Sequence, residues 1–200
     1  MISDRYKPLP QTPVCRNGCF VLGSLNPSSY IKVDSPALEV MTDLARIPPA
    51  TVESGDSFDQ ANQAMILRGV RLLLVTEKGG RVAGVVTARD LLGEKPVRVA
   101  NARGVRRDEL EVRDVMTPLD QMEAMDMADV LAARVGHVIA TLEQCGRQHA
   151  IVFEKDAADG RQTLRGIFSA SQIARQLGVD LTTHEVARTF AEIEAAFAGV

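Results

Sequence analysis

The stretch GVVTARDLLG, at residues 84–93, decides how this sequence is interpreted. Its first half is apolar and β-branched, as in a buried strand, and its second half has the pattern of a helix. Thr87 and Asp90 stand at the junction with the spacing of a capping box at a helix N-terminus. The same turn would direct free N–H groups at an anion. The stretch therefore leaves two alternatives open, a helix cap or a ligand site.

The composition is that of an ordinary globular protein. The chain has 200 residues, of which 46% are hydrophobic and 24% charged, and its formal net charge is −3. No apolar stretch approaches the roughly 20 residues that span a bilayer, and the first residues lack the pattern of a signal peptide. Net acidity and few aromatic residues argue against nucleic-acid binding. We therefore expect a cytoplasmic protein without membrane insertion.

An internal repeat fixes the organisation of the chain. Three stretches recur in the same order, at offsets that grow from 75 to 77 and then to 82 residues. The second increase falls between two apolar runs, where an insertion at a hairpin tip is well tolerated. The paired stretches are EVMTD (39–43) with DVMTP (114–118), RLLLV (71–75) with QHAIV (148–152), and GVVTARD (84–90) with GIFSASQ (166–172).

Each copy predicts the order strand, helix, strand, strand, helix. In the first copy, Ser57 and Gln60 form a capping box at the start of the long helix, and Gly69 ends it. The elements predicted there are strands at 49–52, 72–75 and 82–86 and helices at 57–69 and 88–92. Those predicted in the second copy are strands at 123–127, 149–152 and 164–168 and helices at 135–144 and 170–177.

The motif GVVTARD, the weaker GIFSASQ and the duplicated order resemble a tandem CBS-domain pair, or Bateman module. The resemblance implies an α/β (α+β) fold of two CBS repeats that pack about a pseudo-two-fold axis and leave two clefts. In that family the clefts commonly hold adenine nucleotides or related adenosyl ligands. Modules usually dimerise, and they regulate other proteins without chemistry of their own. A homodimer and an unidentified protein target are therefore expected.

The resemblance and the residues together predict five segments. The linker mixes arginines with acidic residues, which is typical of a solvated surface. In the C-terminal segment, Val186, Phe190, Ile193 and Phe197 form an amphipathic stripe that packs either on the module itself or on a partner. The segments are an N-terminal arm (1–36), repeat 1 (37–93), a linker (94–112), repeat 2 (113–179) and a C-terminal helix (180–200).

The family pattern places a ligand site in the first repeat. The Thr87 hydroxyl corresponds to the group used toward phosphate, and Asp90 to the carboxylate used toward the ribose diol. Arg89 is a further candidate for phosphate. Residues around the first strand would line the base and the second strand would flank it, which adds Ala88, Ala50, Thr51, Val52, Leu72 and Leu73. AMP, ADP, ATP and other adenosyl compounds all carry the diol, so the ligand within this class stays open.

The second repeat predicts a degenerate site. Ser169 and Gln172 form an equally good capping box, but a neutral amide is a poorer partner for a diol than a carboxylate. Phe168, next to Ser169, either crowds that cleft or packs against the closing helix. We therefore expect one competent cleft and one that has lost its carboxylate.

Neither a catalytic nor a metal centre is predicted. Cys15 and Cys19 lack the two further ligands of a zinc site, and Cys145 stands alone. No nucleophile motif, phosphate-binding glycine loop or metalloprotease motif is present, so no enzyme activity and no cofactor are expected. The leading hypothesis is a freestanding sensor that binds an adenosyl ligand in the first cleft and transmits a change of shape or dimer. The alternative is a ligand-free, dimeric structural adaptor.

Overall fold

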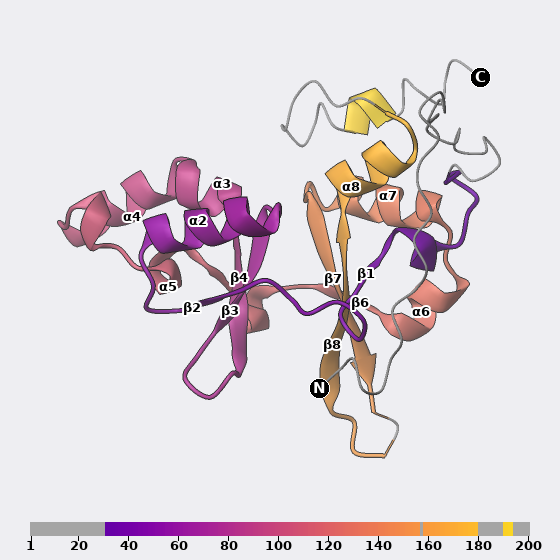
Figure 1. The fold of residues 1–200 in the computed structure, drawn as a ribbon, viewed down its shortest axis with the longest axis horizontal. Helices are drawn as coiled ribbons and strands as arrows, with labels where there is room; N and C mark the ends of the chain where they lie inside the picture. Colours follow the sequence, from indigo (N-terminus) through magenta and orange to yellow (C-terminus); the bar gives the residue numbers. More distant parts are fainter. Residues whose placement is uncertain (1–30, 157, 180–189, 194–200) are drawn as a thin grey trace, which may run out of the picture. The chain divides into compact units, whose positions relative to one another are not determined.

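The computed structural model describes residues 31–156, 158–179 and 190–193. Two copies of one arrangement follow each other in the predicted order, which confirms the mixed α/β fold and the duplication (Figure 1). The first copy consists of β2 (Thr51–Glu53), α2 (Phe58–Arg68), β3 (Leu72–Thr76), β4 (Val82–Thr87) and α3 (Ala88–Leu92). The second consists of β6 (Ala124–Asp126), α6 (Met127–Ala132), α7 (Val135–Gln144), β7 (His149–Lys155), β8 (Gln162–Ser169) and α8 (Ala170–Gln176). The short helix α6 has no predicted counterpart.

Helix α2 begins and ends where its sequence predicts. The Ser57 hydroxyl accepts from the Gln60 N–H at 3.3 Å, and the Gln60 amide oxygen accepts from the Ser57 N–H at 2.8 Å. Gly69 ends the helix with a φ of 63°, a left-handed conformation that glycine adopts without steric cost. One face of the helix is buried against the first sheet.

Each repeat is completed by a segment that precedes the other repeat. We call residues 37–43 and 112–118 the leading segments. The first contains β1 (Thr42–Asp43), which pairs antiparallel with β8, so the second sheet has the order β1-β8-β7-β6. The second contains β5 (Thr117–Pro118), which pairs antiparallel with β4, so the first sheet has the order β2-β3-β4-β5. Each leading segment therefore adds a strand to the sheet of the repeat that does not directly follow it in the sequence.

The short helices of the leading segments pack in the same way. Ala37 and Val40 lie on the 3-10 helix η2 (Ala37–Val40) and are buried in the core of the second repeat. Val112 and Val115 lie on α5 (Val112–Val115) and are buried in the core of the first. Backbone hydrogen bonds fix both positions, because the Ala37 N–H donates to Ala133 and the Val112 N–H to Asp56.

Each repeat has its own hydrophobic core, and a third cluster joins the two sheets. Phe168 is fully buried in the second core, and Val86 holds the equivalent position in the first. The third cluster combines Leu72 and Val85 of the first sheet with Ile151 of the second. The two repeats therefore bury apolar side chains against each other.

The segment 94–112 differs from the predicted linker because most of it is helical. It contains α4 (Lys95–Arg103) and the 3-10 helix η3 (Arg107–Glu109). Pro96 and Ala100 of α4 are buried, and Ala100 belongs to the first core. The mixed charges nevertheless pair with one another as a solvated surface does: Arg106 with Asp108, Arg103 with Asp114 and Arg113 with Glu111. The mixed charges did not reveal this helix, which buries Pro96 and Ala100 and packs Val99 against the first core.

Part of the C-terminal stripe packs on the chain's own module. Residues 190–193 are helical, and Phe190 and Ile193 are buried in the second core. Val186 and Phe197 lie outside the described residues, as do Cys15, Cys19 and most of the N-terminal arm. Within the described part of the chain, no helix has both the length and the apolar character that a membrane span requires.

Candidate functional site

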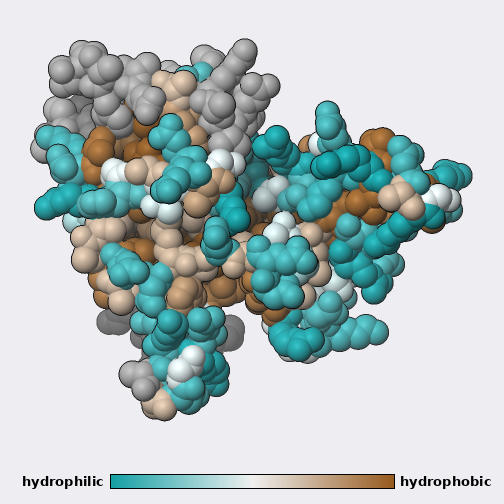
Figure 2. All heavy atoms as spheres, turned by 180° about the vertical axis from the view of Figure 1, so that it is seen from behind, coloured by the Kyte–Doolittle hydropathy of each residue, from teal (hydrophilic) through white to brown (hydrophobic). Residues whose placement is uncertain are grey.

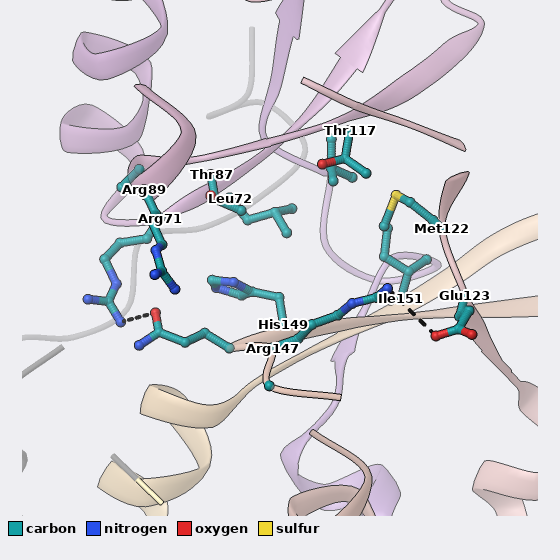
Figure 3. Close-up of a pocket in the computed structure, with 14 residues that line it drawn as sticks. Arg71, Leu72, Thr87, Arg89, Thr117, Met122, Glu123, Arg147, His149 and Ile151 are labelled. Atoms are coloured by element: carbon teal, nitrogen blue, oxygen red, sulfur yellow. Dashed lines mark hydrogen bonds and ion pairs between the residues drawn. The ribbon is translucent and has the colours of Figure 1, made fainter. Parts of the chain in front are cut away.

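A cleft lies where the end of the first repeat's hairpin meets the second repeat. We call it the first cleft; its volume is about 450 Å³ (Figure 3). The first repeat contributes residues at the start of β3 and at the junction of β4 with α3. The second contributes the turn before β7 and the chain before β6. The lining residues are Arg71, Leu72, Val85, Thr87, Ala88, Arg89, Thr117, Met122, Glu123, Gly146, Arg147, Gln148, His149 and Ile151.

The Thr87–Asp90 pair caps α3 in this structure. The Thr87 hydroxyl accepts from the Asp90 N–H at 3.3 Å, and the Asp90 carboxylate accepts from the Thr87 N–H at 2.9 Å. The same carboxylate oxygen is 2.6 Å from the Thr87 hydroxyl oxygen, and the other is 3.0 Å from the Lys95 ammonium. Asp90 does not line the first cleft, whereas Thr87 does. The ligand role of the motif remains a prediction, and Lys95 is a partner that the motif did not reveal.

Three arginines line the first cleft. Arg71 donates to the Gln148 side-chain oxygen at 3.5 Å, and Arg147 is 3.6 Å from the Glu123 carboxylate. Figure 3 shows that Arg71 and Arg89 come from the first repeat and Arg147 from the second. Only Arg89 was predicted from the sequence. Arg71 lies just before β3 and Arg147 just before β7, but the two aligned copies pair Arg71 with Gln148, so the repeat did not point to these arginines.

The rest of the lining is mainly apolar. Leu72, Val85 and Ile151 belong to the cluster between the two sheets, and Met122 packs against that cluster. The first cleft thus combines apolar walls with cationic side chains. Such a lining suits a ligand that has a flat apolar part and an anionic part.

His149 lies between the first cleft and its counterpart in the other repeat, because it lines both. Burial lowers the pKa of its imidazole to about 4, and the charge of Arg71 contributes in the same direction. The side chain is therefore neutral near pH 7, where it offers one donor and one acceptor to a ligand.

The lowered pKa of His149 predicts an acid-dependent loss of stability. Between pH 6.5 and 4 the unfolded chain binds a proton on this residue and the folded chain does not, so acidification favours unfolding. We expect a loss of about 1 kcal/mol from this residue between about pH 7.5 and about pH 5.5. Urea unfolding of the wild type and of His149→Gln at both pH values gives the loss of stability in each protein. The loss in the wild type minus the loss in the variant is the contribution of His149. Equal losses in both proteins would refute the assignment.

The structure divides the predicted ligand residues between several places. Leu72, Thr87, Ala88 and Arg89 meet in the first cleft. Leu73 and Val52 are buried in the first core, Thr51 is exposed, and Ala50 lines a different cleft. Ala50, Thr51 and Val52 therefore do not line the cleft that holds Thr87, and their ligand role stays a prediction. The repeats pack so that Met122 and Glu123, just before the second repeat's first strand, take that place.

Ala50 belongs to a second cleft of about 260 Å³, related to the first by the duplication. This cleft contains Ser169 and Gln172, but they do not form the predicted capping box. The Gln172 side-chain oxygen instead accepts from the Thr42 hydroxyl at 3.4 Å, because the first leading segment brings Thr42 beside α8. Phe168 does not line the cleft, so of its two predicted roles packing is the one observed.

No metal centre is found in the part of the chain that the structure describes, where no three potential His, Cys, Asp or Glu ligands gather. Cys145 is a free, exposed thiol. The two other cysteines, Cys15 and Cys19, lie outside this part.

Residues 37–96 match the family model of the CBS domain. An uncharacterised conserved protein from Pyrococcus horikoshii has a TM-score of 0.52 at 20% identity, over 77% of this chain and 100% of that one. CBSX2 in complex with AMP has a TM-score of 0.48 at 20% identity, over 70% and 94%. The CBS domain pair of MJ0100, in complex with 5′-methylthioadenosine and S-adenosyl-L-methionine, has 0.48 at 19%, over 74% and 98%. No curated protein matches at a significant level.

Proposed function

We propose that this chain, which carries a CBS domain at residues 37–96 and repeats that fold in its second half, is a regulatory module for an adenosyl ligand. The ligand, an adenine nucleotide or a related adenosyl compound, occupies the first cleft. The observation that carries the proposal is the joint presence of three arginines and four large apolar side chains around one cavity.

The lining matches the parts of a nucleotide one by one. An adenine ring is flat and suits the apolar walls, while phosphate oxygens suit Arg71, Arg89 and Arg147. A carboxylate offers about four lone-pair positions, and three hydrogen bonds occupy the Asp90 carboxylate. Ribose hydroxyls could also replace the Thr87 hydroxyl or the Lys95 ammonium as hydrogen-bond partners of the Asp90 carboxylate. Capping and ribose binding are therefore compatible roles of Asp90.

Regulation would follow from the fact that both repeats contribute residues to the lining of the first cleft. Arg71 and Arg89 belong to the first repeat, whereas Arg147 and His149 belong to the second. A ligand that contacts both sets stabilises the arrangement in which they are close and shifts the population toward it. A protein target that distinguishes the arrangements would respond to the ligand.

The homodimer forms part of the proposal. Exposed apolar side chains gather on the helices of the first repeat, where Ile66, Leu67, Leu92 and Val97 are between 54% and 85% exposed. Figure 2 shows apolar surface among hydrophilic residues on this repeat, at the right of the view. In the second repeat, Glu143 and Gln144 hold the positions of Ile66 and Leu67. Burial of this apolar surface would favour association, and the mass of the protein in solution tests it.

Thermal unfolding with adenosine, AMP, ADP, ATP and S-adenosylmethionine tests the ligand. A ligand at a hundredfold excess over its dissociation constant adds about 2.7 kcal/mol to stability. Asp90→Asn should weaken the ligand that shifts the wild type by about tenfold, because it removes a charged acceptor. Asp114→Asn is the matched control, because Asp114 caps α5 through the Glu111 N–H and pairs with Arg103, and neither partner lines the cleft. Asp90, in contrast, bonds to Thr87, which does line it.

Both variants should lose about 1 kcal/mol of stability, because each weakens a cap. A shift that survives in Asp114→Asn and falls in Asp90→Asn supports the proposal. If none of these compounds shifts the wild type, the motif is a cap alone, and the ligand-free adaptor becomes the leading hypothesis.

A further inference from the structure

The described lining of the second cleft carries three arginines and no carboxylate. The arginines are Arg68, Arg71 and Arg175. Among the residues that the structure describes, these three arginines form no ion pair. Asp43, the acid beside Thr42, is already paired with Arg165 and with Arg46. The first cleft differs, because Glu123 pairs with its Arg147.

Two of the guanidinium groups are close enough to influence each other. Burial lowers the pKa of Arg71 below its usual value, and the charge of Arg175 lowers it further. Their hydrogen bonds are to neutral oxygens, since Arg71 donates to Gln148 and Arg175 to the Ser171 carbonyl at 3.3 Å. Arg71 is half-buried and Arg175 is exposed, so solvent screens part of their repulsion, and an anion bound between them would offset the rest.

The second cleft has no group suited to a ribose diol. The position of Asp90 is taken by Gln172, whose side-chain oxygen accepts from Thr42. Its other polar side chains are the His149 imidazole and several hydroxyls, and the Ser169 and Ser171 hydroxyl oxygens lie 3.2 Å apart. A site of arginines and hydroxyls without an available carboxylate selects an anion and not a sugar.

We propose that the second cleft binds a compact polyphosphate and does not require a ribose. The phosphates come either from a free inorganic polyphosphate or from the tail of a nucleotide. Arg71 and His149 line both clefts, so a polyphosphate in the second cleft engages a cation that the first cleft also uses. This inference does not depend on the proposed function, because Arg68, Arg175 and the serine hydroxyls line the second cleft and not the first.

Calorimetric titration with tripolyphosphate, at constant ionic strength, tests the inference. Arg175→Gln and Arg68→Gln should each weaken binding by about tenfold, because each removes a charged donor. Arg89→Gln is the control for the first cleft, and Arg98→Gln, on the exposed face of α4, is the control for loss of one positive charge. Arg98→Gln should bind as the wild type does. Arg89→Gln removes a phosphate partner proposed for the first cleft and should weaken binding much less than Arg175→Gln does.

Competition distinguishes the two sources and separates this inference from the adenosyl proposal. Displacement of tripolyphosphate by ATP but not by adenosine supports the tail of a nucleotide, and failure of ATP to displace it supports a free polyphosphate. Wild-type protein that does not bind tripolyphosphate overturns the inference. Equal weakening in Arg89→Gln and Arg175→Gln also overturns it, because the anion would then occupy the first cleft. Adenosine has no phosphate, so its binding reports the first cleft whatever the outcome here.

Discussion

Replacement of Phe168 by alanine is expected to lower the free energy of unfolding by about 4 kcal/mol. The ring is fully buried in the second core, among residues of η2, α7 and α8. Its removal leaves a cavity that the surrounding helices fill only in part, so the loss exceeds the transfer free energy of the ring. Urea unfolding followed by circular dichroism measures the change.

The duplication supplies the matched control for this substitution. Val86 is equally buried at the equivalent position of the first repeat, and Val86→Ala removes much less volume. We expect a loss of about 2 kcal/mol for that variant. Losses of the same size in the two variants would contradict the assignment of Phe168 to a close-packed core.

Gly84→Ala should cost about 3 kcal/mol, because β5 pairs with β4 at that residue and its backbone approaches Gly84 closely. A methyl group on Gly84 would overlap the Thr117 carbonyl oxygen and lie 3.1 Å from the Pro118 Cα. Both obstacles are backbone atoms, so the second leading segment must move as a whole. Hydrogen exchange should then show faster exchange at the amides of β5 together with the lower stability.

Gly166 is the equivalent residue of the second repeat and serves as the control. A methyl group there would approach the Met41 side chain, with its Cγ at 2.8 Å. Because a methionine side chain can adopt another rotamer, we expect Gly166→Ala to cost about 1 kcal/mol. If Gly84→Ala lowered stability no more than Gly166→Ala does, the close approach of the β5 backbone to Gly84 would be refuted.

The elements that local sequence determines were predictable. The Ser57–Gln60 and Thr87–Asp90 capping boxes and the turn at Gly69 set element boundaries through hydrogen bonds within a few residues. The pairing of Thr42 with β8 was not predictable in this way, because nothing near Thr42 identifies a partner so far along the chain. Ser169 illustrates the same limit, because Gln172 bonds to Thr42 instead of closing a local cap.

The candidate site was predictable to the extent that it lies in one motif. Thr87, Ala88 and Arg89 are adjacent in sequence and line the same cleft. Arg147 and His149 reach that cleft from the other repeat, through packing that the motif does not encode. Ala50 lines the second cleft and not the cleft of Thr87, which strand pairing within a repeat does not reveal.

The leading segments impose an order on folding during synthesis. β5 follows the first repeat closely, so that repeat has all of its strands while the second is still unmade. Thr42, in contrast, is separated from its partner Gln172 by 130 residues. At ribosomal rates the first leading segment waits on the order of ten seconds for β8 and α8 to emerge. During that interval Ala37 and Val40 lack the core that later buries them, so this segment of the nascent chain is exposed to chaperones and to aggregation.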